Sequence, residues 1–297
     1  MKILSIGEIL WDVYAGREHL GGAPFNFAAH ASRLGHEVLL LSAVGCDDRG
    51  SRALERMAEL GLLTCFIGLA PNQLTGFVSV DLDAENQPRF VIHRPAAYDF
   101  IYFAESEYRQ FAEWDPDWIY FGTLHQTARL ARESTELLLR RCPRAKRFYD
   151  VNLRADSFTP ALVCDLLRCA DVVKLNEAEA VELTRIFETP YSSLELFCRS
   201  CKDRFGWEAV CVTRGAQGCA LLVGDEYVQA EGFAIEVCDS VGAGDAFAAA
   251  FLHGLEAGWP VKEIADSANR LGALVASREG AVPAWTPEEC LALGNRG

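Results

Sequence analysis

The chain has 297 residues, half of them hydrophobic, so it can bury a sizeable core without disulfides or metals. Forty-two acidic and 28 basic residues give a net charge of −14, and no run of basic residues occurs, which argues against a broad nucleic-acid or anionic-membrane surface. The apolar stretches are far shorter than the ~20 residues of a membrane helix, and residues 1–7 indicate a first strand rather than a signal peptide. We therefore expect a cytosolic protein.

Strand-like segments alternate with amphipathic segments along most of the chain, which is typical of βαβ units on one parallel sheet. Most of these segments are apolar on both faces, as buried parallel strands are. The predicted strands are Lys2–Gly7, Glu37–Ala43, Trp118–Phe121, Arg147–Val151, Val172–Leu175, Ala209–Thr213 and Cys219–Val223. The pattern therefore predicts an α/β fold with a mostly parallel sheet.

Amphipathic stretches between these strands predict helices that flank the sheet. Arg49–Leu60 ends at Gly61, Ala128–Arg140 carries its leucines on one stripe, and Ala246–Ala257 ends at Gly258. A glycine directly after a helix is a common stop signal, because it adopts the left-handed conformation at little cost.

One region breaks the alternation of strands and helices. Thr75–Leu82 and Arg89–His93 predict two strands joined by a polar turn over residues 83–88, which makes a hairpin rather than a crossover. Together with residues near Val13–Leu20, this hairpin would form a small sheet outside the main one. Such a sheet could serve as a lid over a pocket, or it could be an edge hairpin with no moving part.

The cysteines do not form a disulfide framework. Eleven cysteines, an odd number, are scattered from Cys46 to Cys290, so we expect reduced thiols. Cys198 and Cys201 have the spacing of half a zinc site, but no second pair follows to complete four ligands.

The segment around residues 239–247 has the features of an anion site. Gly242, Ala243 and Gly244 directly precede a predicted helix, and small residues let backbone N–H groups approach an oxyanion at the positive end of the helix dipole. A carboxylate at Asp245 would repel phosphate unless it accepts a hydroxyl proton. The alternative is that Asp245 merely stabilises the helix start. The sequence contains no Walker loop and no Gly-x-Gly-x-x-Gly after its first strand, which disfavours P-loop proteins and dehydrogenases.

A second polar segment lies near the amino end. Gly22 belongs to a double glycine that exposes backbone for hydrogen bonding, and Asn26 offers both a donor and an acceptor to a hydroxyl-rich ligand. Asp12, just past the first strand, could accept two hydroxyl protons from a sugar. The alternative is that Asp12 is an ordinary acid of a surface loop.

Two long patterns together resemble a known family. Gly21-Gly22-Ala-Pro-Phe-Asn26-Phe-Ala28, followed by Gly35 and Gly45, and Asp239-Ser-Val-Gly242-Ala-Gly244-Asp245 resemble the two signatures of the ribokinase-like carbohydrate kinases, the pfkB family. The resemblance implies transfer of the γ-phosphoryl group from ATP to a sugar hydroxyl. It also implies a single domain over residues 1–297, a doubly wound sheet and a β lid from about residues 12–20 and 75–100.

The resemblance assigns roles residue by residue. Asp245 matches the family's catalytic base, and Gly242, Ala243 and Gly244 match the backbone anion hole. The positions that hold the sugar's hydroxyls are matched by Asp12, Gly22 and Asn26.

Further matches concern the nucleotide and metal ions. Asn176 and Glu179 match an Asn-x-x-Glu element associated with phosphate and with Mg²⁺ bound through water, although the same spacing is also a helix-capping arrangement. The residues that resemble the nucleotide-accepting strand and turn are Thr213, Gly215 and Gly218, for which a plain tight turn is the alternative. Asp239 and Val241 resemble positions that help to bind a monovalent cation such as K⁺ in several relatives.

The substrate is the least determined feature. Ala23 and Pro24 before Asn26 resemble fructokinases, so fructose leads. Arg154 ends an Asp-x-Asn-x-Arg element that resembles one in fructokinases and in 2-keto-3-deoxygluconate kinases, where it could bind a phosphate or a carboxylate bidentately. Arg94, at the end of the hairpin, either reaches the sugar or faces solvent.

Three alternatives to a fructokinase stay open: a 2-keto-3-deoxygluconate kinase, a nucleoside kinase, and a sensor that binds without turnover. A carboxylate at Asp245 argues against the sensor, because a pure binder gains nothing from an acid beside phosphate. The resemblance also implies a homodimer through the lid strands, since exposed strand edges invite pairing.

Overall fold

The computed structural model describes residues 1–14, 16–82, 88–154, 157–189 and 192–294. Its main sheet consists of β1 (Lys2–Ile6), β4 (Glu37–Gly45), β5 (Ile67–Ala70), β8 (Trp118–Gly122), β9 (Lys146–Asp150), β10 (Val172–Asn176), β11 (Ala209–Thr213), β12 (Cys219–Val223) and β13 (Glu226–Ala230). Within the described residues the strand order is β13-β12-β11-β10-β9-β8-β1-β4-β5. Pairing is parallel from β5 to β11 and antiparallel at β12 and β13. The sheet is therefore mostly parallel, as predicted.

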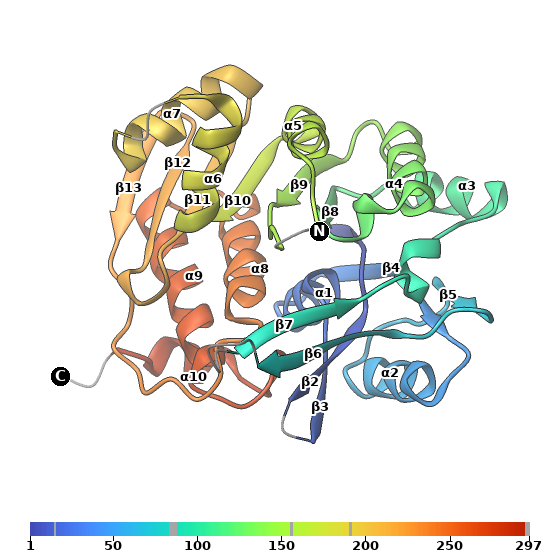
Figure 1. Ribbon diagram of the computed structural model, residues 1–297. Coiled ribbons are helices and arrows are strands. Elements are labelled where there is room, and N and C mark those ends of the chain that lie inside the picture. The colour runs from blue at the N-terminus through green and yellow to red at the C-terminus, as the bar shows by residue number, and fades with distance from the viewer. Residues whose placement is uncertain (15, 83–87, 155–156, 190–191, 295–297) are drawn as a thin grey trace.

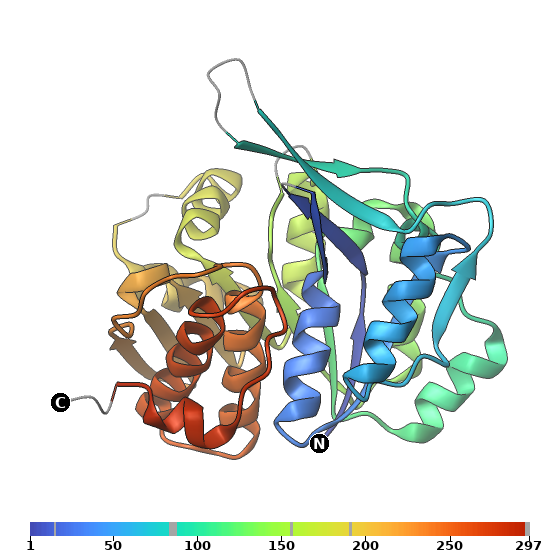
Figure 2. The same ribbon diagram turned by 90° about the horizontal axis from the view of Figure 1, so that it is seen from below.

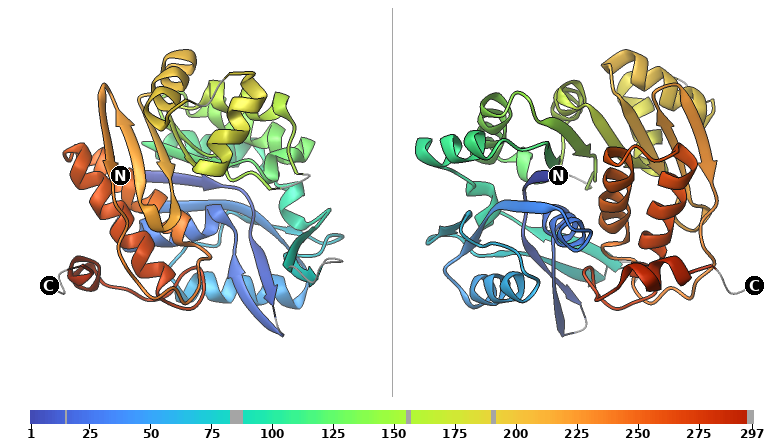
Figure 3. Two further views of the ribbon diagram at one scale, coloured as in Figure 1. Left: turned by 60° about the vertical axis from the view of Figure 1, so that its left-hand side comes forward. Right: turned by 180° about the vertical axis from the view of Figure 1, so that it is seen from behind.

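Helices cover both faces of this sheet (Figure 1). One face packs against α1 (Ala23–Arg33), α2 (Asp48–Glu59), α8 (Ala243–Glu256) and α9 (Val261–Ala276). The other packs against α3 (Glu105–Trp114), α4 (Arg129–Arg141), α5 (Pro160–Cys169), α6 (Glu177–Phe187) and α7 (Leu194–Phe205). The short helix α10 (Pro287–Ala292) contacts α9. Figure 3 shows the blue α1 and the red-orange α8 and α9 on the same face. No helix in the described part of the chain is long and apolar enough to cross a membrane.

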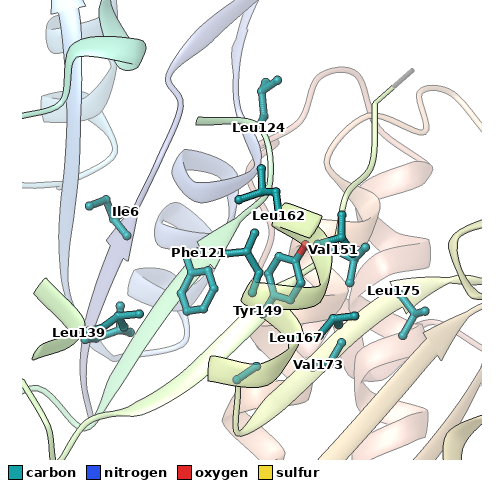
Figure 4. Packing of buried hydrophobic residues seen from close by; sticks show 14 of the residues in the cluster. Ile6, Phe121, Leu124, Leu139, Tyr149, Val151, Leu162, Leu167, Val173 and Leu175 are labelled. Atoms are coloured by element: carbon teal, nitrogen blue, oxygen red, sulfur yellow. The ribbon is translucent and has the colours of Figure 1, made fainter. Parts of the chain in front are cut away.

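Side chains alternate along the central strands and so divide the core in two. Phe121, Tyr149 and Val173 point toward the face covered by α4 and α5, where they meet Leu139 and Leu162 (Figure 4). Each such buried side chain contributes about 1.5–3 kcal/mol of transfer free energy. Because successive residues of a strand face opposite sides, the polar residues at alternate positions of these strands face α1 and α8 instead.

A second, four-stranded sheet contains the predicted hairpin. Its strands are β2 (Leu10–Tyr14), β3 (Arg17–Gly21), β6 (Gly76–Leu82) and β7 (Pro88–His93), in the order β3-β2-β6-β7. β6 and β7 pair antiparallel, whereas β2 and β6 pair parallel. Most of the predicted turn, residues 83–87, lies outside the described residues. Figure 2 shows this sheet at the carboxyl end of the main strands, remote from the amino terminus.

The segment after His93 packs into the body of the protein. Ala97–Phe100 form the 3-10 turn η1, and Ala97, Tyr98 and Asp99 are buried. The small sheet therefore ends before the predicted limit of residue 100, because these residues belong to the core beside β4.

The predicted elements agree with the structure within a few residues, and β11 and β12 have the predicted bounds. The largest difference among these helices is at the start of α8, which begins at Ala243 rather than at Ala246. Gly242 takes a left-handed conformation with φ of 76° and caps the helix early. Asp245 thus lies inside the first helical turn. The short strand β5 was not predicted, nor was β13.

Candidate active site

Asp245 is buried where the first turn of α8 meets the first turn of α1. The side-chain amide of Asn26 donates a hydrogen bond of 2.8 Å to Asp245 Oδ2. Burial raises the pKa of Asp245 to about 7, and the nearby ammonium of Lys174 opposes this rise. A carboxyl group with such a pKa is suited to accept a proton near neutral pH.

The backbone that leads into α8 forms an anion site. A Cβ on Gly242 would lie 2.4 Å from the carbonyl oxygen of Ala281, so only glycine fits at this position. Within the described residues, no acceptor takes a hydrogen bond from the amide N–H of Gly242 or Gly244. Unpaired amides at a helix N-terminus attract anions, as the helix dipole does. This arrangement fits the phosphoryl groups of a nucleotide.

Three polar residues line the sheet beneath this turn. Lys174 Nζ lies 3.0 Å from both carboxylate oxygens of Asp150, and Tyr120 donates a hydrogen bond of 2.9 Å to Asp150 Oδ2. All three side chains are buried. Lys174 and Asp150 are direct partners in the register of β9 and β10, which places them on one face of the sheet.

Residues predicted to bind a sugar gather on the side of Asp245 nearer the small sheet. Asp12 lies on β2, and its partial burial raises its pKa to about 6. The guanidinium of Arg154 lowers the pKa of both Asp12 and Asp245, so its positive charge lies near both carboxyl groups. Gly22 has φ of 111°, and a Cβ there would lie 2.3 Å from the carbonyl oxygen of Glu8. The fold therefore brings Asp12, Gly22 and Arg154 toward Asn26 and Asp245.

Arg94 bridges two 3-10 turns of the protein body. Its guanidinium donates hydrogen bonds to Asp99 in η1, to the carbonyl of Leu124 just before η2 (His125–Thr127), and to Thr127 in η2. These protein groups hold the head group of Arg94, and its contact with a sugar stays a prediction.

Asn176 and Glu179 form the capping arrangement that the sequence left open. Asn176 Oδ1 accepts the amide N–H of Glu179 at 2.9 Å, and Glu179 Oε2 accepts that of Asn176 at 2.8 Å. Glu179 Oε1 accepts the amide N–H of Leu153 at 2.8 Å, which joins α6 to the segment after β9. Each carboxylate oxygen keeps a further lone pair, so the group fits a magnesium-bound water. Binding of Mg²⁺ stays a prediction.

The residues predicted for the nucleotide lie at the same end of the sheet. Thr213 is the register partner of Asn176 on the neighbouring strand β11. Gly215 and Gly218 both have positive φ in the tight turn between β11 and β12, and a Cβ on Gly218 would lie 2.1 Å from the carbonyl oxygen of Ala230. The tight turn is therefore present, and its contact with a nucleotide stays a prediction.

Asp239 organises the loop before α8. Its Oδ1 accepts the amide N–H of Val241 at 3.0 Å, and its Oδ2 accepts that of Gly280 at 3.1 Å. The carboxylate thus joins two loops beside Gly242. A monovalent cation at Asp239 and Val241 stays a prediction.

Several buried polar residues at this end of the sheet were not predicted, among them Lys174, Tyr120, Glu8 and His125. Lys174 stands between the buried apolar residues Val173 and Leu175, which is a signal that the sequence does carry. Glu8 Oε2 and His125 Nδ1 lie 3.7 Å apart and are both buried. They follow β1 and β8 at their carboxyl ends, but only the fold brings them together.

Comparison with known proteins identifies the family. The model of the pfkB family carbohydrate kinases matches residues 7–288. The chain belongs to this family. It is a carbohydrate kinase, a phosphotransferase with an alcohol group as acceptor.

Relatives and solved structures cover nearly the whole chain. A fructokinase of Salmonella typhimurium is 28% identical over 302 residues, covering 95% of this chain and 95% of the relative. The structure of a Xylella fastidiosa fructokinase with bound ATP has a TM-score of 0.85 at 24% identity, covering 98% of this chain and 97% of the other. A fructokinase double mutant of Vibrio cholerae O395 with fructose, ADP and a potassium ion has a TM-score of 0.81 at 23% identity, covering 98% and 97%. This chain shares the ribokinase-like fold with both of these structures.

Proposed function

We propose that this carbohydrate kinase transfers the γ-phosphoryl group of ATP to a hydroxyl of D-fructose. The observation that carries the proposal is the buried Asp245 carboxyl, which lies beside the unpaired amides of Gly242 and Gly244. A proton acceptor and an anion site so close together suit attack of a hydroxyl on a phosphoryl group. Fructose is favoured by Ala23 and Pro24 and by the fructokinases among the relatives.

The reaction follows from this geometry. Asp245 takes the proton of the sugar hydroxyl as the oxygen bonds to the γ-phosphorus, and the bond from this phosphorus to the bridging oxygen of ADP breaks. The amides of Gly242 and Gly244, together with that of Ala243, which also donates a long hydrogen bond of 3.4 Å to the carbonyl oxygen of Ser240, stabilise the negative charge on the phosphoryl oxygens. Asn26 holds the Asp245 carboxyl through its hydrogen bond and so orients it.

The sugar is held by groups on the lid side. Asp12 accepts hydrogen bonds from its hydroxyls, the backbone at Gly22 and the amide of Asn26 contact it, and Arg154 and Arg94 supply further donors. The small sheet of β2, β3, β6 and β7 acts as a lid that excludes water from the phosphoryl group. Two lids pairing through their edge strands would form a homodimer.

ATP lies along the carboxyl ends of β10 and β11 in this proposal. Asn176, Thr213, Gly215 and Gly218 contact the nucleotide, and Glu179 holds Mg²⁺ through water. Bound Mg²⁺ neutralises charge on the ATP phosphates. Asp239 and the carbonyl of Val241 bind K⁺, for which the potassium ion of the Vibrio cholerae fructokinase is support.

A second substrate class is favoured by one observation. Arg154 is an exposed guanidinium close to Asp12 and Asp245, and a guanidinium binds carboxylates bidentately. An acid sugar such as 2-keto-3-deoxygluconate would use this group. A nucleoside acceptor would instead need an apolar surface for its base.

The test is a panel of acceptors incubated with MgATP while ADP release is followed. The panel contains fructose, ribose, 2-keto-3-deoxygluconate and adenosine, with Asp245→Asn as the inactive reference. We expect the highest kcat/KM with fructose. A higher kcat/KM with 2-keto-3-deoxygluconate would overturn fructose as the substrate. If no acceptor in the panel releases ADP faster than the Asp245→Asn variant does, the proposed function is overturned.

A further inference from the structure

A lysine inside the central sheet has no role in the function described so far. Lys174 lies on β10, where the neighbouring residues Val173 and Leu175 are fully buried and apolar. A buried ammonium is costly unless charged or polar groups compensate it, so such a lysine needs a specific reason. Because successive side chains of β10 point to opposite faces of the sheet, Lys174 faces α8, the helix that carries Asp245.

Residues of the neighbouring strands β9 and β8 fix the position of the ammonium. Both oxygens of Asp150 accept hydrogen bonds of 3.0 Å from Lys174 Nζ. Tyr120 on β8 donates a hydrogen bond of 2.9 Å to the same carboxylate. Three adjacent strands thus hold one cation in a defined place, and two of its three protons are used by Asp150.

The upper side of the ammonium faces the first turn of α8. A Cβ placed on Gly244 would lie 3.3 Å from Lys174 Nζ, so a glycine at this position leaves the space above the cation open. Asp245 is the next residue and is buried beside it. The positive charge of Lys174 lowers the pKa of Asp245, and the charge of Asp245 in turn raises the pKa of Lys174.

We propose that Lys174 is a positioning residue whose ammonium, held by Asp150 and Tyr120 under the first turn of α8, is the buried countercharge of Asp245. This inference rests on the proposed function of Asp245 as the base. With the countercharge in place, the carboxyl can be ionised before the sugar hydroxyl arrives, although it is buried. Asp150 keeps the cation from moving onto Asp245 and blocking the oxygen that must receive the proton.

Other groups around Asp245 do not replace this cation. The charged or titratable groups around Asp245 and Lys174 include, among the described residues, Tyr120 on β8, Asp150 on β9, Arg154 after β9, Glu179 on α6 and Cys211 on β11. Asp150 raises the pKa of Asp245, and Arg154, which lowers it less than Lys174 does, is exposed. Lys174 is therefore the buried cation that acts on the base.

The test compares the acid limb of kcat/KM against pH in matched variants. Lys174→Met should move this limb up by about 1 pH unit or more, whereas Asp150→Asn should move it down because it removes a like charge. The double variant with Lys174→Met and Asp150→Asn removes both members of the Lys174–Asp150 ion pair, so neither is left charged without the other, and its limb should lie above that of Asp150→Asn. Lys146→Met, which removes an exposed lysine paired with Glu208 at the start of β9, is the control and should leave the limb in place.

A second measurement does not depend on turnover. The ¹³C carboxyl resonance of Asp245, identified by its loss in Asp245→Asn, is titrated in the ligand-free protein, and its midpoint should move as the acid limb does. An unchanged midpoint in folded Lys174→Met and in the double variant would overturn the inference, as would a loss of kcat without a shift of the limb, which would indicate a direct contact with phosphate. If no acceptor is phosphorylated but the midpoint moves, the proposed function fails and the countercharge stands.

Discussion

Asn26 and Asp245 lie 219 positions apart in the chain, yet their side chains share a hydrogen bond of 2.8 Å. Each stands in the first turn of its helix, Asn26 in α1 and Asp245 in α8. The packing of these two helices brings both N-termini to the same end of the sheet. The Asn26 amide thus contacts the carboxyl that we propose as the base.

Asp245→Asn should lower kcat by about two to four orders of magnitude, because a positioned base is lost while the shape of the side chain is kept. Affinity for the sugar, measured by calorimetry without ATP, should change little. Asp225→Asn, at an exposed turn remote from the site, is the control and should keep full activity. A near-normal kcat in Asp245→Asn would remove the role of base.

The pH dependence should reflect two carboxyl groups. Asp245 has a pKa of about 7, so kcat/KM should fall about tenfold for each pH unit below 7, as the base becomes protonated. Below pH 6 the fall should steepen, because Asp12 with a pKa of about 6 is protonated as well and no longer binds the sugar as a carboxylate. The profile is measured at saturating MgATP.

The Asp12→Asn variant separates these two groups. It should have a lower kcat/KM, but its profile should keep the single tenfold slope below pH 7 and lack the steeper part. A profile of the unmodified protein that is flat from about pH 5 to 8 would contradict both assignments.

Gly242→Ala should destabilise the protein and abolish activity. The left-handed conformation alone costs about 1–2 kcal/mol with a side chain, and the added Cβ would also meet the backbone of Ala281. Gly206→Ala is the matched control, since Gly206 has φ of 78° but an open surrounding. Urea unfolding should show a smaller loss of unfolding free energy for Gly206→Ala than for Gly242→Ala, and Gly206→Ala should retain activity. Equal losses in the two variants would show that the contact with Ala281 is unimportant.

His30 should make the protein less stable in acid. Trp285 donates a hydrogen bond to His30 Nδ1 at 3.0 Å, so His30 carries its proton on Nε2, which donates to the carbonyl of Ala281 at 3.0 Å. Burial lowers the pKa of His30 to about 4, so the unfolded chain binds a proton below pH 6.5 that the folded chain does not bind. This contribution to the free energy of unfolding is complete above pH 6.5 and is lost as the pH falls toward 4, by about 3 kcal/mol.

The experiment compares the unfolding free energy at pH 7 and pH 4.5 in the unmodified protein and in His30→Gln. The fall in the free energy of unfolding from pH 7 to pH 4.5 should be about 2.5 kcal/mol smaller in His30→Gln than in the unmodified protein. An identical pH dependence in His30→Gln would disprove this role.

The elements were accessible to sequence reasoning because they depend on local chemistry. Apolar runs such as Ala209–Thr213 must be buried whatever surrounds them, and the glycine after a helix stops it locally. α8 starts earlier than predicted, because Gly242 adopts a left-handed conformation that begins the helix at Ala243, in a space beside Ala281 that only glycine fits. Glu179 shows the converse: its spacing from Asn176 predicted either a cap or a metal ligand, and the structure shows both oxygens bound to backbone amides.

The sequence alone indicated most strands and helices in their order, the family, and Asp245 as the proposed base, since these depend on neighbouring residues and on two continuous patterns. Only the tertiary structure decided which distant groups surround that base. Lys174, Asp150 and Tyr120 come from three separate strands, and the register and pleat of the sheet set them on one face. Electrostatic interactions act through space and not along the chain, so the charge state of Asp245 is a property of the folded protein.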